Sequence, residues 1–143
     1  MTSKAVVHHA RSARWILAAA LAVSACGGGS HATAPPGPPS LVEQGAGLVQ
    51  AKPCLVCHTT NGGSGAGPTF AGLAGSQVKL SDGSTVTADD AYLERSILDP
   101  DAQTVAGFRK GLMSSLVPPH SLTTRQAAAI VAYIDTLAGR PSG

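Results

Sequence analysis

Apolar residues recur at helical spacing in three segments after residue 40. The first segment, Leu41 to Lys52, is preceded by Ser40. Glu43 follows three positions after Ser40, and this spacing is the capping-box pattern of a helix N-terminus. Its apolar positions fall on one face of the predicted helix: Leu41, Leu48 and Val49. Gly45 and Gly47 each cost about 1 kcal/mol in a helix relative to alanine. We therefore expect both glycines where a second helix packs closely.

The last segment provides a partner for this helix. It runs from Thr123, with Gln126 as a second capping box, to Gly139, which is expected to follow the helix end. Its apolar stripe and flanking residues are Ile130, Val131, Tyr133, Ile134 and Leu137. Tyr133 is expected to cross onto the bare backbone at Gly45.

The third helical segment lies between these two and follows a hairpin pattern. Short strands are predicted at Gln77 to Leu80 and at Thr85 to Thr87, joined by an Asp82-Gly83 turn. The helix should span Ala88 to Leu98, with Thr87 as its cap and Pro100 preventing continuation. Its inner residues are expected to be Tyr92, Leu93 and Ile97.

The N-terminal region has a different pattern. Lys4, Arg11 and Arg14 precede an apolar run, Trp15 to Val23, that is too short to span a bilayer and ends in small residues. Residues 1–25 are therefore predicted to be a secretory signal peptide. Residues 26–40, rich in glycine, serine and proline, are predicted to be a flexible tether, and residues 41–143 to be the folded domain.

The junction "VSAC" resembles the lipobox of bacterial lipoproteins, with Val23, Ser24 and Ala25 before Cys26. The resemblance implies cleavage before Cys26, lipid on its sulfur and attachment to the extracytoplasmic face of a bacterial membrane. The alternative is cleavage near the same place that releases a soluble protein.

Removal of the predicted signal changes the charge balance. The whole chain has a formal net charge of +2, but Lys4, Arg11 and Arg14 lie in the signal. From Cys26 onward seven Lys and Arg residues face eight Asp and Glu residues, a net charge of about −1. Nucleic acid is therefore not an expected partner. Aromatic residues make up only 3% of the chain, so a small domain of this composition should need a staple for its core.

Cys54 and Cys57 are the two thiols of the predicted domain, and several chemistries could use them. Zinc would require Cys54, Cys57, His58 and His120, a spacing that fits the usual paired ligands poorly. A thioredoxin-like site requires a strand before the first cysteine, where a helix is predicted. A thiol nucleophile requires an orienting acid that the neighbouring sequence lacks.

The sequence Cys54-Leu55-Val56-Cys57-His58 is instead the attachment signature of c-type haem. Two cysteines three positions apart on a turn present both sulfurs to the vinyl groups on one porphyrin edge. The next residue then brings its imidazole beneath the iron. Export agrees with this interpretation, because covalent haem attachment occurs outside the cytoplasm.

The stretch from Leu41 to Leu137 resembles the small class I cytochromes c, and most of all the cytochrome c domain fused to subunit II of bacterial terminal oxidases. The resemblance is carried by "CLVCHT", "GPTFAGLAG", "VKLSDGSTVTADDAYLERSILDP" and "IVAYIDTL". It implies an all-α fold wrapped around one covalent haem, with the hairpin as a short insertion.

The resemblance also implies roles for individual residues. Cys54 and Cys57 would hold the haem, His58 would be the proximal iron ligand, and the Pro68 carbonyl would orient its imidazole. The other implied contacts are Phe70 and Leu73 on the porphyrin and Tyr92 and Arg95 facing the propionates. For Arg95 the alternative is an ordinary solvated cation paired with Glu94 or Asp99.

The distal iron ligand is where the sequence departs from the family pattern. The family usually has Met-Pro, whereas Met113 is followed by Ser114. Met113 is the only methionine after the signal, and a thioether suits low-spin iron and raises its potential. His120 would instead give bis-histidine ligation, and a third possibility leaves the sixth position open. We expect Met113.

Taken together, these features predict a membrane-anchored monohaem cytochrome c that carries single electrons between respiratory redox proteins, to or within a terminal oxidase. Such a protein is an electron carrier and not itself an enzyme. The alternatives are a haem-based sensor or peroxidase-like protein with an open or displaceable sixth ligand, and a zinc- or thiol-based binding module.

Overall fold

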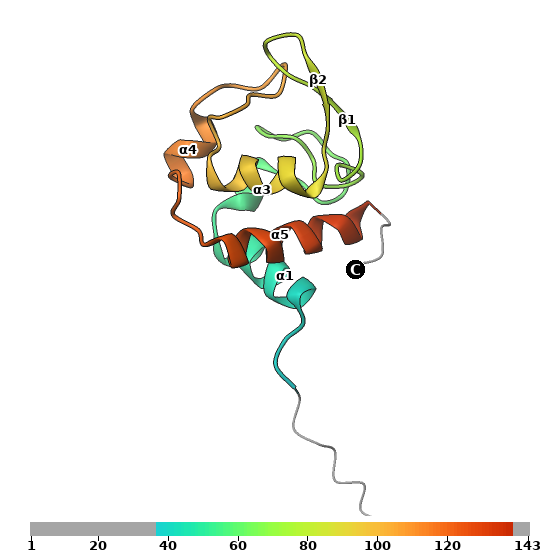
Figure 1. Cartoon of the computed structure of the whole chain (residues 1–143), viewed down its shortest axis with the longest axis vertical. Coiled ribbons are helices and arrows are strands. Elements are labelled where there is room, and N and C mark those ends of the chain that lie inside the picture. Colours follow the sequence, from blue (N-terminus) through green and yellow to red (C-terminus); the bar gives the residue numbers. More distant parts are fainter. Residues whose placement is uncertain (1–36, 139–143) are drawn as a thin grey trace, which may run out of the picture. The chain divides into compact units, whose positions relative to one another are not determined.

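The computed structural model describes residues 37–138. The elements in this range are α1 (Leu41–Ala51), α2 (Cys54–Cys57), β1 (Gln77–Lys79), β2 (Thr85–Thr87), α3 (Asp90–Leu98), α4 (Leu112–Leu116) and α5 (Thr124–Leu137) (Figure 1). The predicted signal peptide, Cys26, the tether up to residue 36 and Gly139 lie outside the described residues. No helix within residues 37–138 is long and apolar enough to cross a membrane.

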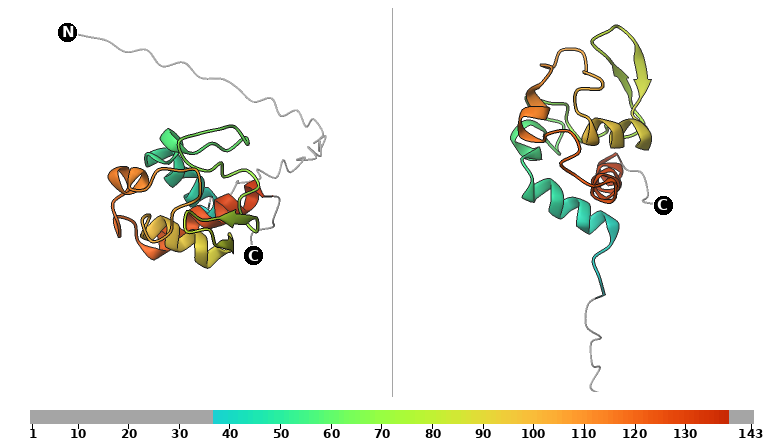
Figure 2. Two further views of the ribbon diagram at one scale, coloured as in Figure 1. Left: turned by 90° about the horizontal axis from the view of Figure 1, so that it is seen from above. Right: turned by 60° about the vertical axis from the view of Figure 1, so that its left-hand side comes forward.

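Helices α1 and α5 pack side by side and form the base of the fold (Figures 1 and 2). Both begin with the predicted capping boxes. The Glu43 amide donates to Ser40 Oγ (3.2 Å) while the Ser40 amide donates to Glu43 Oε2 (2.7 Å). Thr123 and Gln126 make the same reciprocal pair at α5. Each box satisfies backbone donors that the first helical turn leaves without partners, which confirms both predicted helix starts.

The contact between α1 and α5 depends on Gly45. A Cβ atom at this position would collide with the backbone carbonyl of Ala129 and lie 3.0 Å from Tyr133 Cβ. The predicted crossing of Tyr133 onto Gly45 is therefore confirmed. The same expectation for Gly47 is wrong, because Gly47 is exposed and has nothing within 4 Å of such a position. Leu41 is also exposed, so the inner face of α1 is narrower than predicted.

The hairpin agrees with its sequence pattern. β1 pairs antiparallel with β2, with Val78 opposite Val86. The Asp82 carboxylate closes the turn by accepting hydrogen bonds from the Ser84 amide (2.9 Å) and hydroxyl (2.6 Å). β1 ends one residue earlier than predicted, since Leu80 forms an isolated bridge with Val105 outside the hairpin.

The start of α3 differs from the prediction. Asp89 caps the helix, with Oδ1 accepting a hydrogen bond from the Tyr92 amide (2.8 Å). Thr87 cannot serve as the cap because it belongs to β2, where its hydroxyl accepts from Gln77 Nε2 (2.9 Å). Ala88 is likewise still held by the hairpin region, since its amide donates to the Ser76 carbonyl (2.9 Å). The helix therefore begins at Asp90.

The buried core joins α1, α3 and α5 to the hairpin. The predicted inner residues of α3, Tyr92, Leu93 and Ile97, are all buried. Val49, Ile130 and Ile134 are buried at the base of the fold, and Val78 and Leu80 bring the hairpin into the same cluster. The helix-rich architecture with one small antiparallel hairpin confirms the predicted fold class.

Candidate haem site

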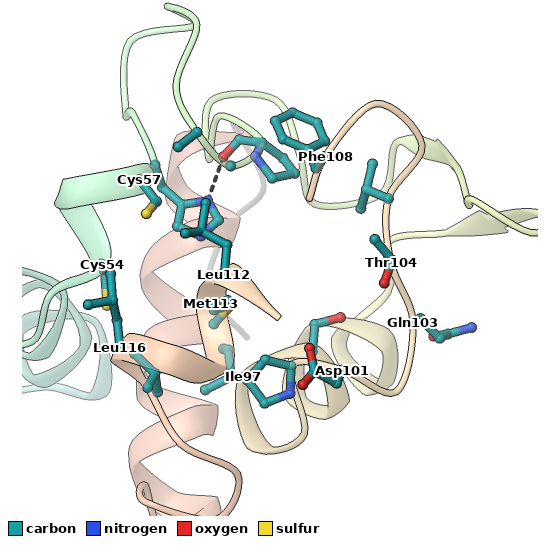
Figure 3. A pocket seen from close by; sticks show the side chains of 18 of the residues that line it. Cys54, Cys57, Ile97, Asp101, Gln103, Thr104, Phe108, Leu112, Met113 and Leu116 are labelled. Atoms are coloured by element: carbon teal, nitrogen blue, oxygen red, sulfur yellow. Dashed lines mark hydrogen bonds between the residues drawn. The ribbon is translucent and has the colours of Figure 1, made fainter. Parts of the chain in front are cut away.

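A pocket opens between the chain around α2, helix α3, the segment before α4, and α4 itself (Figure 3). The predicted site residues that line it are Cys54, Cys57, His58, Pro68, Phe70, Leu73, Tyr92 and Met113. Segments far apart in the sequence thus meet at one apolar cavity.

The two cysteines begin and end α2, a single helical turn that follows Pro53. Residues three apart in a helix share a face, and Figure 3 shows Cys54 and Cys57 along the same side of the pocket. Both are free thiols, and burial raises the pKa of Cys54 above its usual value. The residues between them are exposed, with 46% of Leu55 and 73% of Val56 accessible. The turn therefore directs sulfur inward and apolar side chains outward.

The His58 ring is held in a defined tautomer. Its Nδ1 lies 2.7 Å from the Pro68 carbonyl oxygen, the contact dashed in Figure 3. A carbonyl can only accept, so Nδ1 carries the proton and Nε2 keeps its lone pair. Burial lowers the pKa of His58, and the hydrogen bond to Pro68 opposes this shift only in part. The neutral imidazole is the form that binds a metal ion.

The loop after His58 folds back tightly behind the ring. The Gly67 amide donates to the Cys57 carbonyl (2.9 Å), and a Cβ at Gly67 would lie only 2.6 Å from His58 Cε1. The Phe70 amide donates to the Thr59 carbonyl (2.7 Å), and the Phe70 ring stacks on the imidazole with centroids 4.6 Å apart. The loop thus confines His58 on several sides.

Hydroxyl groups close the base of this loop. Thr59 Oγ1 donates to the Gly63 carbonyl (2.7 Å) and lies 2.9 Å from Thr69 Oγ1. Thr69 also accepts from the Gly62 amide (3.2 Å). Neither threonine had a predicted role. A signal was available, because both are short hydroxyl residues at the two ends of a glycine-rich run.

Met113 comes to the pocket on α4, a short helix that the sequence pattern did not predict. The helix begins after Gly111, which has a left-handed backbone (φ 79°), and the Gly111 amide donates to Asp101 Oδ1 (3.1 Å). A glycine adopts this conformation without the strain that a side chain would add. Met113 therefore reaches the cavity from a wall built separately from the one that carries His58.

A family model for cytochrome c matches residues 42–138. The chain belongs to the cytochrome c family. Among solved structures, it is similar to cytochrome cH from Methylobacterium extorquens, with 24% sequence identity and a TM-score of 0.49. That match covers 66% of this chain and 97% of the other. No significant match was found among curated protein sequences.

Membership of the family implies covalently attached haem c, and the residues that line the pocket fit that group. The cavity walls are largely apolar, as a porphyrin requires. Two free thiols lie on one side, and a neutral imidazole is held with its Nε2 unprotonated. Gly67 also lies so close to the His58 ring that any larger residue at position 67 would collide with the imidazole.

Two residues singled out from the sequence lie away from the cavity of this cytochrome c. Arg95 is exposed on α3, whereas Tyr92, Ser96 and Ile97 of the same helix line the pocket. The predicted role of Arg95 at the propionates stays a prediction. His120 is exposed too, and its amide donates to the Leu98 carbonyl (2.8 Å).

The arrangement also bears on the zinc and thiol alternatives. Within residues 37–138 no group of three or more His, Cys, Asp and Glu side chains gathers in a way that could hold a metal ion. His120 in particular is outside the cavity that Cys54, Cys57 and His58 line. The element before Cys54 is helix α1 rather than a strand, so the thioredoxin-like context is not present either.

The segment before α4 adds polar lining residues that the sequence analysis did not single out. Figure 3 shows Gln103 and Thr104 across the pocket from the cysteines, with Asp101 nearby. Phe108 of the same segment and Leu112 and Leu116 of α4 also line the pocket. No periodic pattern marks the segment, so only the fold identifies it as part of the site.

Proposed function

We propose that this cytochrome c carries one haem, attached through Cys54 and Cys57, and transfers single electrons between redox proteins. Membership of the family supports a covalent c-type haem and an electron carrier that works with redox partners. The observation that carries the assignment of residues is one cavity lined by two free thiols, a neutral imidazole and a thioether.

His58 is proposed as the proximal iron ligand, because its Nε2 keeps the lone pair that ligation requires. The Pro68 carbonyl holds the opposite nitrogen and increases the basicity of the ring. Phe70, Leu73 and Tyr92 provide apolar surface that excludes water from the cavity. Burial raises the pKa of Tyr92, so its hydroxyl stays protonated. When bound, haem supplies the one-electron chemistry of its iron.

Met113 is proposed as the distal ligand. Met113 lines the cavity and His120 does not, which supports the thioether over bis-histidine ligation. A thioether stabilises the reduced iron and raises the potential. A sensor or peroxidase-like protein would instead need a sixth position that is open or easily vacated.

Exposed apolar side chains beside the cavity mouth support docking of a partner there. Leu55 and Val56 project from the turn that bears the cysteines, and Leu116 on α4 is 43% exposed. Apolar side chains that are exposed together as one patch mark interaction sites. We propose that redox partners dock transiently at this edge, which shortens the path for the electron.

We further propose that residues 1–25 are removed on export, that Cys26 carries lipid, and that residues 26–40 tether the domain of residues 41–143 to a bacterial membrane. The lipobox-like "VSAC" and the proline- and glycine-rich composition after it support this organisation. A flexible tether raises the effective concentration of the domain near membrane enzymes. The proposed partner is a respiratory complex, with a terminal oxidase favoured by the resemblance to oxidase subunit II domains.

Production of the full chain with a haem-maturation system tests the proposed function. A haem stain on a denaturing gel should label the wild type at the position of the protein and should not label the Cys54→Ser, Cys57→Ser double variant. The reduced protein should show a six-coordinate low-spin spectrum that carbon monoxide changes little. An unlabelled wild type would refute haem attachment, and ready binding of carbon monoxide would favour the sensor.

Fractionation of cells tests the proposed location. The wild type should sediment with membranes, whereas Cys26→Ser should be released or remain as an unprocessed precursor. Ser30→Ala, a matched change four residues further along, should behave as the wild type. Equal sedimentation of Cys26→Ser as a mature protein would contradict the lipid anchor.

A further inference from the structure

The β-hairpin is joined by its backbone to the segment that leads into α4. The Ser81 amide donates to the Thr104 carbonyl (2.8 Å), and the Ala106 amide donates to the Lys79 carbonyl (2.8 Å). Between these two bonds, Leu80 and Val105 form an antiparallel bridge. Figure 1 shows the segment before α4 running up to the hairpin. The hairpin is thus joined to a segment from the distal side of the cavity by two hydrogen bonds and one isolated bridge.

The hairpin itself is well fixed in the fold. Leu80 is only 3% exposed and belongs to the buried core together with Val78. Its amide donates to the Ser84 carbonyl (2.8 Å), while its neighbours bond to the segment on the other side. Asp82 closes the turn through Ser84. A segment bonded to this hairpin is therefore bonded to the core.

The segment held by the hairpin is part of the cavity wall. Thr104, Val105 and Phe108 line the pocket, and the Phe108 amide donates to the Val105 carbonyl (3.1 Å). Between this segment and Met113 lie Gly107 and Gly111, both with left-handed backbones (φ 85° and 79°). The stretch has open space beside these two glycines, since nothing lies within 4 Å of a Cβ placed at either position. The position of α4 then depends on the fixed segment before it together with the bond from the Gly111 amide to Asp101 Oδ1 (3.1 Å).

We propose that the hairpin is a positioning element for Met113. By holding Thr104 to Ala106 against the core, it restrains the chain that delivers α4 and so limits how readily an outside ligand displaces Met113 from the iron. The proposal rests on the proposed function, in which Met113 is the distal ligand. Neither Ser81 nor Lys79 touches the cavity, so they act only through the segment they bind.

A simpler role would be general stability, and the two roles predict different results. A hairpin that only stabilises the fold would, when weakened, lower the unfolding temperature and leave ligand competition at the iron unchanged. A positioning element would change the competition even in variants that remain folded. The test therefore needs a readout of the distal ligand and a matched change within the same hairpin.

Imidazole titration of the ferric, haem-loaded protein provides that readout, because imidazole competes with Met113 for iron. Ser81→Pro removes the amide that donates to Thr104. Ser84→Pro is the matched control, since its amide bonds only within the turn, to Asp82. Loss of one restraining hydrogen bond should make apparent imidazole binding about five- to tenfold tighter in Ser81→Pro. Ser84→Pro should titrate within about twofold of the wild type.

Ala106→Pro removes the bond from the Ala106 amide to the Lys79 carbonyl. This variant should also bind imidazole about five- to tenfold more tightly. Hydrogen exchange should be faster at residues 104–111 in both test variants, with the amides of α1 and α5 unchanged. The proposal would be overturned if Ser81→Pro and Ala106→Pro both bound imidazole with the affinity of the wild type. It would also be overturned if Ser84→Pro showed the same increase in imidazole affinity as they do. Failure of either variant to retain haem leaves the other to decide it, and loss of both with Ser84→Pro intact would indicate the stability role and overturn positioning.

Met113→Ala separates this proposal from the proposed function. If that variant keeps the absorption band typical of methionine-ligated ferric haem, then Met113 is not the ligand and the distal assignment itself fails. If the band disappears in Met113→Ala while Ser81→Pro and Ala106→Pro titrate as the wild type, only the positioning role of the hairpin fails.

Discussion

The two walls of the cavity are built in different ways. The proximal wall, residues 53–73, bonds mostly to itself: the Pro68 carbonyl holds His58, Gly67 donates to Cys57, and Phe70 donates to Thr59. The distal wall, residues 99–117, has a five-residue helix and is fastened to the core through a hairpin that lies well before it in the chain. One wall is a closed local loop, and the other depends on remote contacts.

The difference indicates where the site can change without losing the haem. On the proximal side the His58 ring is held by a carbonyl, a stacked phenyl and a closely approaching glycine. On the distal side Met113 moves with a short helix that Gly111 and Asp101 hold at its start. We therefore expect proximal changes to affect stability and distal changes to affect ligand exchange and potential.

The largest effect is expected from removing the distal thioether. Met113→Ala should lower the reduction potential by about 0.1 V or more, within the range of about 0.8 V over which axial ligands set haem potentials. His120→Ala should leave it nearly unchanged, because His120 lies outside the cavity. Redox titrations of the wild type, Met113→Ala and His120→Ala measure both changes in potential. A large fall in His120→Ala with little change in Met113→Ala would reverse the ligand assignment.

A change on the proximal side should act on stability instead. Gly67→Ala would place a Cβ 2.6 Å from His58 Cε1, and overpacking of this kind typically lowers the free energy of unfolding by about 1–3 kcal/mol. Gly63→Ala is the control, since its nearest neighbour is the Asn61 side chain at 3.1 Å, which is exposed and can rotate. Denaturant unfolding of the haem-loaded proteins should separate them. Equal stability of the two would mean that the loop is not tightly fitted behind His58.

The smallest effect is expected from a matched pair of glycines on the two walls. Gly62 (φ 84°) and Gly111 (φ 79°) both have left-handed backbones with open space around them, so alanine at either adds strain of about 1 kcal/mol or somewhat more. Gly111→Ala should also tighten imidazole binding several-fold, whereas Gly62→Ala should not. If both variants shift imidazole binding alike, the two walls are not independent.

Local signals in the sequence predicted much of this molecule correctly. The capping boxes at Ser40 and Thr123 and the Asp82-Gly83 turn each depend on residues within a few positions of one another, and all three occur as predicted. Their physical basis is a hydrogen bond whose partners are fixed by short chain distance. The spacing of Cys54, Cys57 and His58 is a signal of the same kind.

The predictions that failed depended on a distant segment. Thr87 has the side chain of a cap, but pairing with β1 leaves that role to Asp89. Gly45 and Gly47 are equivalent in the sequence, yet α5 crosses only at Gly45. In each case two residues of suitable chemistry were available, and the packing partner selected one of them.

The proximal half of the site can be read from contiguous residues, because a turn of four residues and the next imidazole need no other part of the chain to be close together. The distal half cannot. Met113 was one of two possible ligands in the sequence, and α4 was not predicted at all. The place of α4 at the cavity depends on the bonds of Thr104 and Ala106 to the hairpin. These bonds form only after chain segments far apart in sequence have packed on the same core.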